Sequence, residues 1–308
     1  EDHTLQLSEC AGIFHYCQEV FEGLKAYTTE TGEIVCFRPD LNAKRMADSA
    51  ERLCMPAFPE DRFVDAVKQV VEANKDWVPP FGSGATLYVR PFMIATGDVI
   101  GVKPADEYQF RILVTPVGPY FKGGDTAVKL SVAKYDRAAP HGTGNIKAGL
   151  NYAMSLKPGM EAHAAGYAEN LYLDSQSRTY VEETGGANLL FVDKEGNLVV
   201  PQSHTDSILP SVTRRSLVVV AKEYLGLNVI ERPVKYQELL DGDFVECGMC
   251  GTAAVISPVG YVEDGDTVIG FANGLETSGP VMHDLRKTLT DIQQCKIAGP
   301  EGWVCKIC

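Results

Sequence analysis

Apolar residues recur at helical spacing in four stretches of the chain, which predicts four helices. These predicted helices cover residues 39–53, 61–77, 211–224 and 279–292. Asp40 is the expected cap of the first helix, and Pro79-Pro80 follows the second and ends it.

Shorter apolar runs predict strands between and after the first helices. They cover residues 85–95, 108–117, 128–133, 169–174, 189–193, 198–200, 244–247 and 253–257. These strands do not alternate cleanly with long helices, so the pattern favours two α+β domains over a doubly wound sheet. Glycine and charge interrupt the apolar pattern after Phe121. We therefore expect a small α+β domain over 1–122, a linker over 123–134 and a large domain over 135–308.

Length and charge narrow the function classes. The 308 residues suit about two domains at about 150 residues each. Lys+Arg 28 against Asp+Glu 41 gives a net charge of -13, which opposes binding to nucleic acid and to anionic lipid. No apolar stretch approaches the roughly 18 residues that span a bilayer, and the first residues show no signal-peptide pattern. We expect a cytoplasmic protein with no nucleic-acid or membrane partner.

The nine cysteines include two C-x-x-C pairs, Cys247/Cys250 and Cys305/Cys308. A zinc ribbon is one reading of them. However, a compact zinc ribbon has about 15–20 residues between its two pairs, and these two pairs lie much farther apart in the sequence. We expect reduced thiols and no metal.

Two glycine-rich segments are candidates for chemistry. Lys147 stands among small residues in 142–149, where it could form an imine with an aldehyde cofactor, although a lysine in an exposed turn is the commoner case. Glu182 and Glu183 precede Gly185-Gly186, and either acid could face the ring nitrogen of a pyridoxal cofactor. The residues alone do not choose between the two acids, nor do they exclude an exposed turn.

Two further turns could bind an anion. Residues 210–213 open a predicted helix, whose N-terminal amides favour phosphate, and residues 250–253 offer a glycine turn with a hydroxyl. Each could equally be an ordinary cap or hairpin turn.

Eight motifs, in family order, resemble those of the branched-chain amino acid aminotransferases, which are class IV pyridoxal-phosphate enzymes. The first reads HYCQEVFEGLKAY. The motifs lie at residues 15–27, 37–46, 87–91, 116–121, 145–152, 182–188, 208–214 and 251–253. The resemblance is collinear from about residue 13 to about residue 293. It implies the two-domain α+β fold of fold type IV, with the active site between the domains.

The resemblance also implies a cofactor site for pyridoxal 5'-phosphate. Lys147 would be the catalytic lysine that forms the Schiff base and moves the proton. Glu183, rather than Glu182, would pair with the pyridine nitrogen, and Tyr152 with the phenolic oxygen. The expected phosphate-binding residues are Arg45, Val212, Thr213 and Thr252.

The implied reaction is reversible amino transfer from L-leucine, L-isoleucine or L-valine to 2-oxoglutarate, which yields glutamate and a branched 2-oxo acid. The site must therefore accept both an apolar side chain and a second carboxylate, and Arg90 resembles the arginine that binds that carboxylate. The expected substrate-binding residues are Tyr16, Phe21, Tyr88, Arg90, Tyr120, Thr252 and Ala253. Residues 100–102 match a loop that in the family reaches the neighbouring subunit, so a homodimer or larger homo-oligomer is implied.

Three departures limit the resemblance. Cys17 stands where bacterial members usually have glycine, and Ala254 and Ser257 occupy the positions of the redox cysteine pair of the mammalian enzymes. The family's first strand segment would precede residue 1, so we expect the printed sequence to lack an initial segment.

The alternative reading is another class IV enzyme, a D-amino acid aminotransferase or an aminodeoxychorismate lyase. A non-catalytic zinc- or partner-binding protein with the same fold is the rival from another class.

Overall fold

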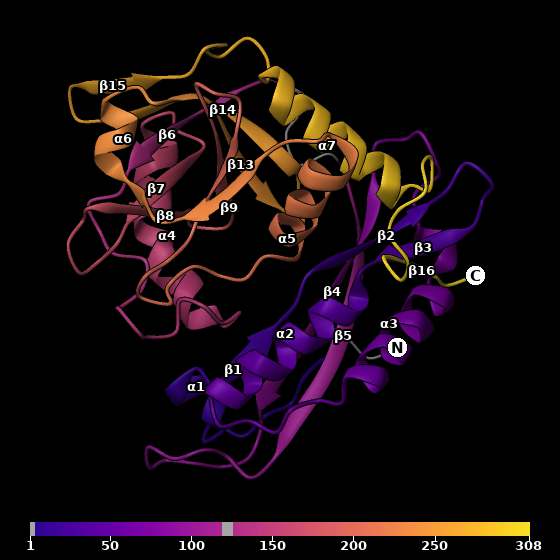
Figure 1. The fold of residues 1–308 in the computed structure, drawn as a ribbon. Helices are drawn as coiled ribbons and strands as arrows, with labels where there is room; N and C mark the ends of the chain where they lie inside the picture. The colour runs from indigo at the N-terminus through magenta and orange to yellow at the C-terminus, as the bar shows by residue number, and fades with distance from the viewer. Residues whose placement is uncertain (1–3, 119–125) are drawn as a thin grey trace. The chain divides into compact units, whose positions relative to one another are not determined.

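The computed structural model describes residues 4–118 and 126–308 and divides the chain into two compact units. Unit 1 contains Glu1–Val117, Ile146–Leu150 and Glu301–Cys308, and unit 2 contains Gly118–Asn145 and Asn151–Pro300. Residues 146–150 and 301–308 thus lie in unit 1, although the sequence analysis expected them in a domain over 135–308. Figure 1 shows the elements of both units.

Unit 1 is built on a six-stranded antiparallel sheet. Its strands are β1 (Glu19–Phe21), β2 (Leu24–Thr28), β3 (Ile34–Phe37), β4 (Thr86–Ala95), β5 (Tyr108–Val117) and β16 (Val304–Lys306). The order is β1-β4-β2-β3-β16, and β5 pairs with β4 along its whole length. The long strand β4 therefore pairs with three other strands of the sheet.

Helices α2 (Pro39–Arg52) and α3 (Glu60–Ala73) contribute to the core of unit 1, together with alternate residues of β4. Because side chains alternate across a strand, the residues between them point to the other face. Leu87 and Val89 are fully buried in the core, whereas Tyr88 and Arg90 are half-buried. Unit 1 also contains the short helix α1 (Gly12–Tyr16) and a 3-10 turn, η1 (Lys75–Trp77).

Two helix predictions in unit 1 need correction. Asp40 does not cap α2: the N-cap is Arg38, in the left-handed conformation, with no side-chain cap bond. Pro39 takes the first helical position, where its fixed φ and missing N–H suit a helix start, so Asp40 falls in the first turn. The second predicted helix ends at Ala73 instead of Trp77, because Asn74 leaves the helical conformation and η1 follows separately.

Unit 2 is built on a ten-stranded mixed sheet. Its strands are β6 (Val128–Val132), β7 (Glu169–Leu173), β8 (Tyr180–Thr184), β9 (Asn188–Asp193), β10 (Leu198–Pro201), β11 (Val229–Arg232), β12 (Val234–Lys235), β13 (Phe244–Gly251), β14 (Val255–Asp264) and β15 (Thr267–Gly270). The order is β11-β10-β9-β13-β14-β6-β7-β8-β12, with β15 beside β14. A further pairing of β8 with β9, at Glu183 and Asn188, closes part of the sheet into a ring.

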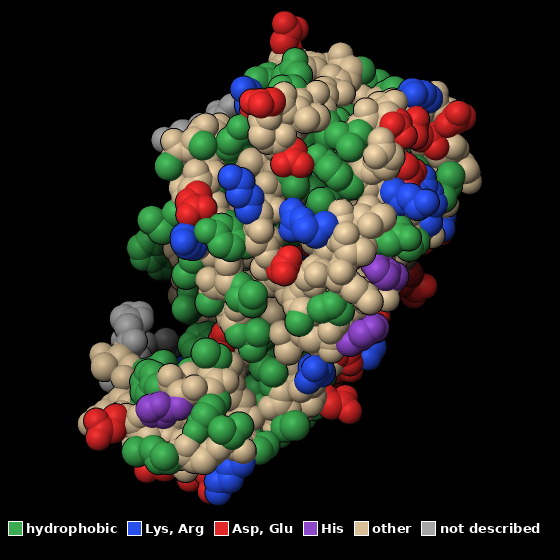
Figure 2. Space-filling view, turned by 90° about the vertical axis from the view of Figure 1, so that its left-hand side faces the viewer, with side chains coloured by type: hydrophobic (Ala, Val, Ile, Leu, Met, Phe, Trp, Pro, Cys, Tyr) green, Lys and Arg blue, Asp and Glu red, His purple; other side chains and the backbone are tan. Residues whose placement is uncertain are grey.

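The helices of unit 2 are α4 (Gly149–Ala164), α5 (Val212–Val219), the π-helical turn η2 (Val220–Tyr224), α6 (Tyr236–Leu240) and α7 (Pro280–Gln293). The sheet encloses a core of leucine, valine and phenylalanine side chains, among them Phe191 and Leu171. Within residues 4–118 and 126–308, no helix combines the length and apolar composition needed to cross a bilayer. Acidic and basic side chains are interspersed over the face drawn in Figure 2.

Candidate active site

The turn that carries Lys147 is fastened to β1 and α2 of unit 1 by three hydrogen bonds. The Phe21 N–H donates to the carbonyl of Lys147 at 3.1 Å. The Lys147 N–H donates to Ser49 Oγ at 3.0 Å, and the Gly149 N–H donates to Glu19 Oε1 at 2.6 Å. The backbone on both sides of the lysine is therefore fixed by residues that are distant in sequence.

The Lys147 side chain lies in a crowded, partly apolar setting. Its Nζ is 4.7 Å from the centre of the Phe21 ring. Burial, and next the nearby Arg45 guanidinium, lower the pKa of Lys147 to about 8. A lysine with this pKa is partly neutral near physiological pH, and the neutral amine is the nucleophilic and basic form.

Arg45 and Glu22 form a buried ion pair in the same unit. Arg45 Nε donates to Glu22 Oε1 and Arg45 Nη2 to Glu22 Oε2, both at 2.7 Å, and Asn42 Nδ2 donates to Oε2 at 2.8 Å. Both charged residues interact electrostatically with Lys147. Sequence reasoning predicted Arg45 but missed Glu22, although Glu22 belongs to the first motif.

A cationic and aromatic wall lies beside Lys147. Arg90 Nη2 donates to the Tyr88 hydroxyl at 2.7 Å, and Arg90 Cζ is 4.7 Å from the centre of the Phe21 ring. Phe21 is thus in contact range of both Lys147 and Arg90. Gly23 permits this arrangement, because a Cβ there would lie only 2.3 Å from the Tyr88 hydroxyl oxygen. Four predicted site residues, namely Phe21, Tyr88, Arg90 and Lys147, are therefore brought together.

The predicted residue Tyr16 lies on α1, and its hydroxyl donates to the carbonyl of Ile100. Ile100 and Val102 are 68% and 90% exposed. The predicted loop 100–102 thus presents apolar side chains to solvent, and Tyr16 anchors its first residue.

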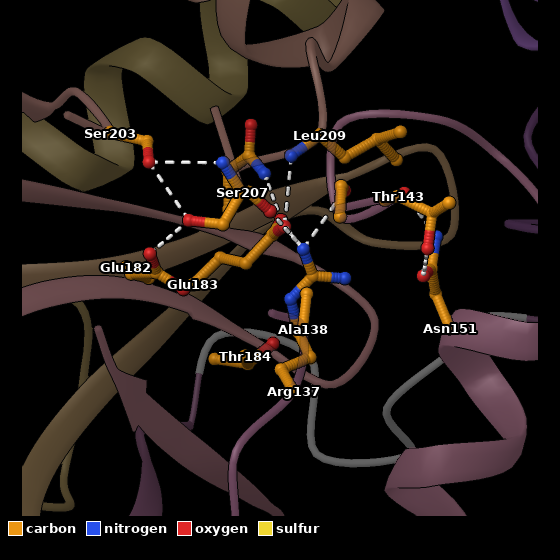
Figure 3. Close-up of polar contacts among 12 residues, drawn as sticks. Arg137, Ala138, Thr143, Asn151, Glu182, Glu183, Thr184, Ser203, Ser207 and Leu209 are labelled. Atoms are coloured by element: carbon orange, nitrogen blue, oxygen red, sulfur yellow. Dashed lines mark hydrogen bonds and ion pairs between the residues drawn. The ribbon is translucent and has the colours of Figure 1, made fainter. Parts of the chain in front are cut away.

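Glu183 is the centre of a buried polar cluster in unit 2 (Figure 3). Its Oε1 lies 2.7 Å from Arg137 Nη2 and accepts the Leu209 N–H at 2.8 Å, and its Oε2 accepts from Asn188 Nδ2. Burial raises the pKa of Glu183, while Arg137 and the Leu209 amide act in the opposite direction. Sequence reasoning missed Arg137, for which the chain gives no local signal.

Glu182 has a different environment from its neighbour. Thr205 Oγ1 donates to Glu182 Oε1 at 3.3 Å and the Ser207 hydroxyl donates to the same oxygen (Figure 3). Alternation along β8 directs the two acids to opposite sides, so Glu182 meets hydroxyl groups and Glu183 meets a guanidinium. Both are buried, with burial raising the pKa of each.

The two turns for which anion binding is predicted lie at the start of α5 and between β13 and β14. Ser211 caps α5, because its Oγ accepts the Arg214 N–H at 3.2 Å. Val212 and Thr213 occupy the first turn, where amides have no acceptor within the helix. Thr252 and Ala253 lie between β13 and β14 and line a pocket with an empty volume of about 460 Å³, part of it open to solvent. Glycine and alanine residues from the loop after Glu183 line the same pocket.

The remaining expectations have separate outcomes. Tyr120 lies outside the described residues, and Tyr152 is half-buried on α4. Cys247/Cys250 belong to unit 2 and Cys305/Cys308 to unit 1. Within the part of the chain that the structure describes, no three His, Cys, Asp or Glu residues are placed to hold a metal ion.

Comparison with known proteins identifies the class. The family model described as amino-transferase class IV matches residues 19–262. Two solved structures are similar over nearly the whole chain. The branched-chain amino acid aminotransferase of Escherichia coli has a TM-score of 0.82 at 29% identity and covers 98% of this chain and 94% of its own. The branched-chain amino acid aminotransferase of Thermobaculum terrenum, solved in its PLP form, has a TM-score of 0.82 at 25% identity. The match covers 98% of this chain and 94% of that structure's chain. The predicted α+β class IV fold is confirmed.

Curated relatives narrow the class. The branched-chain-amino-acid aminotransferase of Haemophilus influenzae is 48% identical over 99% of this chain and 89% of its own length. The branched-chain-amino-acid aminotransferase of Helicobacter pylori is 44% identical over 99% of this chain and 88% of its own length. This chain belongs to the branched-chain amino acid aminotransferase family.

Proposed function

We propose that the protein transfers amino groups reversibly between L-leucine, L-isoleucine or L-valine and 2-oxoglutarate, with pyridoxal 5'-phosphate as cofactor. The observation that carries this proposal is the setting of Lys147. Its backbone is held at 147 and 149, its amine has a pKa lowered to about 8, and a guanidinium and aromatic rings lie beside it. That combination suits a nucleophilic lysine next to an anionic ligand with a planar ring.

The donor set fits the cofactor. Lys147 supplies the amine, Glu183 a buried carboxylate for the ring nitrogen, and Tyr152 a hydroxyl for the phenolic oxygen. The phosphate would be held by Arg45, the amides of Val212 and Thr213, and Thr252. When bound, the cofactor withdraws electrons from the substrate's alpha carbon.

The protein's own residues then carry out the proton work. Lys147 Nζ takes the proton from the alpha carbon and returns it, which requires an amine whose pKa is near the working pH. Glu183 would accept a hydrogen bond from the protonated ring nitrogen, and its buried bonds to Arg137 and Leu209 fix its orientation. Thr252 and Ala253 would bind the substrate's alpha-carboxylate.

The substrate side chain would lie against the aromatic wall. The apolar surface with hydroxyl groups would be given by Phe21, Tyr16 and Tyr88, which suits branched-chain side chains. The resemblance assigns the same role to Tyr120. Arg90 would accept the second carboxylate of glutamate or 2-oxoglutarate.

The test is an absorption spectrum of the purified, cofactor-loaded protein before and after L-leucine is added. We expect a visible band that disappears with leucine and returns with 2-oxoglutarate. Lys147→Ala should abolish both the band and turnover, whereas Lys222→Ala, at an exposed lysine, should change neither. Exclusive activity on D-alanine or aminodeoxychorismate would instead assign another class IV activity.

We also propose a homodimer or larger homo-oligomer in the cytoplasm, with residues 100–102 at the subunit contact. The exposed Ile100 and Val102 side chains support this loop as a contact surface. Sedimentation equilibrium tests the proposal: Val102→Asp should weaken the assembly, and a wild-type protein that sediments as a monomer would contradict it.

A further inference from the structure

The pocket beside Thr252 and Ala253 contains an acid that the reaction described above does not use. Glu169, the first residue of β7, lines this pocket together with the two residues proposed to bind the substrate's alpha-carboxylate. Thr184, which directly follows Glu183 on β8, lines it as well (Figure 3). These residues all belong to unit 2. An acid therefore lines the space in which a second carboxylate is expected to bind.

The Glu169 carboxylate has a defined position. Its Oε1 accepts the Asn170 N–H at 2.9 Å. Its oxygens lie against Gly185, where a Cβ would be 3.0 Å from Oε1 and 3.1 Å from Oε2. Gly185 belongs to the loop that joins β8 to β9, and its neighbours Gly186 and Ala187 line the pocket. The carboxylate is thus held against the loop that forms one wall of the pocket.

Glu169 is the one titratable residue among the described residues that line the pocket. Burial raises the pKa of Glu169 above its ordinary value of 4.5, while the Asn170 N–H, His163 and the Gly185 N–H act in the opposite direction. No lysine or arginine in the described ranges forms an ion pair with Glu169. No permanent cation therefore holds this side chain in its charged form.

Two other titratable groups interact electrostatically with Glu169, namely His163 on α4 and Tyr172 on β7. His163 is exposed, and its Nε2 lies 2.9 Å from the carbonyl oxygen of Ala168. The strands that pair with β7 carry further titratable groups, and these contact other residues: Lys129 contacts Glu263, Tyr180 contacts His204, Glu182 contacts Ser207 and Glu183 contacts Arg137. Of all these groups, Glu169 is the one that borders the pocket.

We propose that Glu169 binds the substrate's alpha-carboxylate as a neutral acid, by donating its O–H, and so couples substrate binding to the uptake of one proton from solvent. Two carboxylates that share a site do not both stay ionised, because each disfavours the charge of the other. The proton goes to Glu169, whose charged form burial already disfavours. The inference rests on the proposed function, which assigns the alpha-carboxylate to Thr252 and Ala253.

Isothermal titration calorimetry of the cofactor-loaded enzyme with 4-methylpentanoate measures this proton without turnover. The probe has the carbon skeleton and the carboxylate of leucine but no amino group. Titrations in buffers of different ionisation enthalpy give the number of protons taken up. Between pH 6 and 9 we expect an uptake that approaches one proton per bound probe, and a Kd that rises by up to about tenfold per pH unit.

Glu169→Gln separates this proton from any taken up at the lysine. Glutamine keeps an oxygen for the Asn170 N–H and a donor for the probe, but it does not titrate. The variant should lose most of the uptake and, at pH 8.5, bind the probe at least about 5-fold more tightly than wild type. Glu195→Gln, at an exposed acid between β9 and β10, is the matched control and should keep the wild-type uptake.

Two failures can be told apart. If wild-type protein shows no leucine-dependent amino transfer, the proposed function is wrong. If the wild type is active but binds the probe without proton uptake, or if Glu169→Gln takes up as many protons as wild type, Glu169 serves to hold the Gly185 loop and the proposal is overturned. Loss of the uptake in His163→Gln, with Glu169→Gln unchanged, would assign the proton to the histidine and overturn it as well.

Discussion

Replacing Arg137 by methionine should strongly destabilise unit 2, because it leaves Glu183 buried without its cation. The two side chains are 6% and 4% exposed, and their charged atoms are 2.7 Å apart. Arg137 also donates to the carbonyls of Gly144, at 2.9 Å, and Ser207. Removing one partner of a buried pair typically costs about 3–5 kcal/mol.

The loss should depend on pH in a defined direction. Burial already raises the pKa of Glu183 above its ordinary value of 4.5, and Arg137 opposes this rise. Without Arg137 the pKa of folded Glu183 rises further, so the native state binds a proton that the unfolded state releases. Stability then falls as pH increases through that window. Arg137→Met should therefore be more destabilising at pH 7.5 than at pH 4.5.

The assay is urea unfolding of wild type and variant at both pH values, followed by circular dichroism. Arg232→Met is the matched control, because Arg232 pairs with Glu238 at 2.6 Å but the two are 38% and 21% exposed. A pair at such a surface is worth about 1 kcal/mol or less. Arg137→Met combined with Glu183→Gln should recover part of the stability. Equal losses for Arg137→Met and Arg232→Met, or no recovery in the double variant, would refute the reasoning.

Three further results are expected. Gly149→Ala should lower kcat about 10-fold or more, because the new Cβ would lie 1.9 Å from Glu19 Oε1 and displace the turn that carries Lys147. Steady-state kinetics measure this, and an unchanged kcat would contradict it. Glu246→Ala should lower the free energy of unfolding, measured with urea, by about 1–3 kcal/mol. The reason is that the buried Glu246 carboxylate accepts hydrogen bonds from the N–H groups of Val281 and Met282 at the start of α7. A loss below about 0.5 kcal/mol would count against this account. In cofactor-free protein, labelling of Lys147 by an amine reagent, followed by peptide mass spectrometry, should rise through about pH 8; a midpoint near 10.5 would show an ordinary lysine.

Local pattern predicted half of the sixteen strands that the structure describes. The strands without a counterpart among the predictions are β1, β2, β3, β8, β11, β12, β15 and β16. β5 occupies the predicted 108–117, and β4 and β6 differ from prediction by one residue at an end. The 16-residue helix α4 was missed. Pro158 lies inside it, and Leu156 and Met160 are exposed, so its apolar residues do not form the one-sided stripe that identifies a helix.

The site shows a clearer limit of sequence reasoning. Motifs indicated Lys147, Arg45 and Glu183, but sequence reasoning assigned no role to the residues that hold the lysine turn and Glu183 in place. Arg137 reaches Glu183 from a segment before the lysine motif, and Glu19 reaches the turn after Lys147 from the first strand. Arg137 lies in the loop between β6 and α4, and the partners of both side chains are distant in sequence, so only the tertiary fold could identify these contacts.

Charge balance within each unit explains why these partners are needed. A buried acid alone would take up a proton, because burial disfavours its charged form. Unit 1 pairs Glu22 with Arg45, and unit 2 pairs Glu183 with Arg137. Each pair satisfies a carboxylate with a rigid donor set inside its own unit, and so each set of polar groups is oriented before any ligand arrives. Because these polar groups are already oriented, their rearrangement costs less free energy during binding and reaction. In each unit the buried acid therefore depends on the arginine that balances its charge.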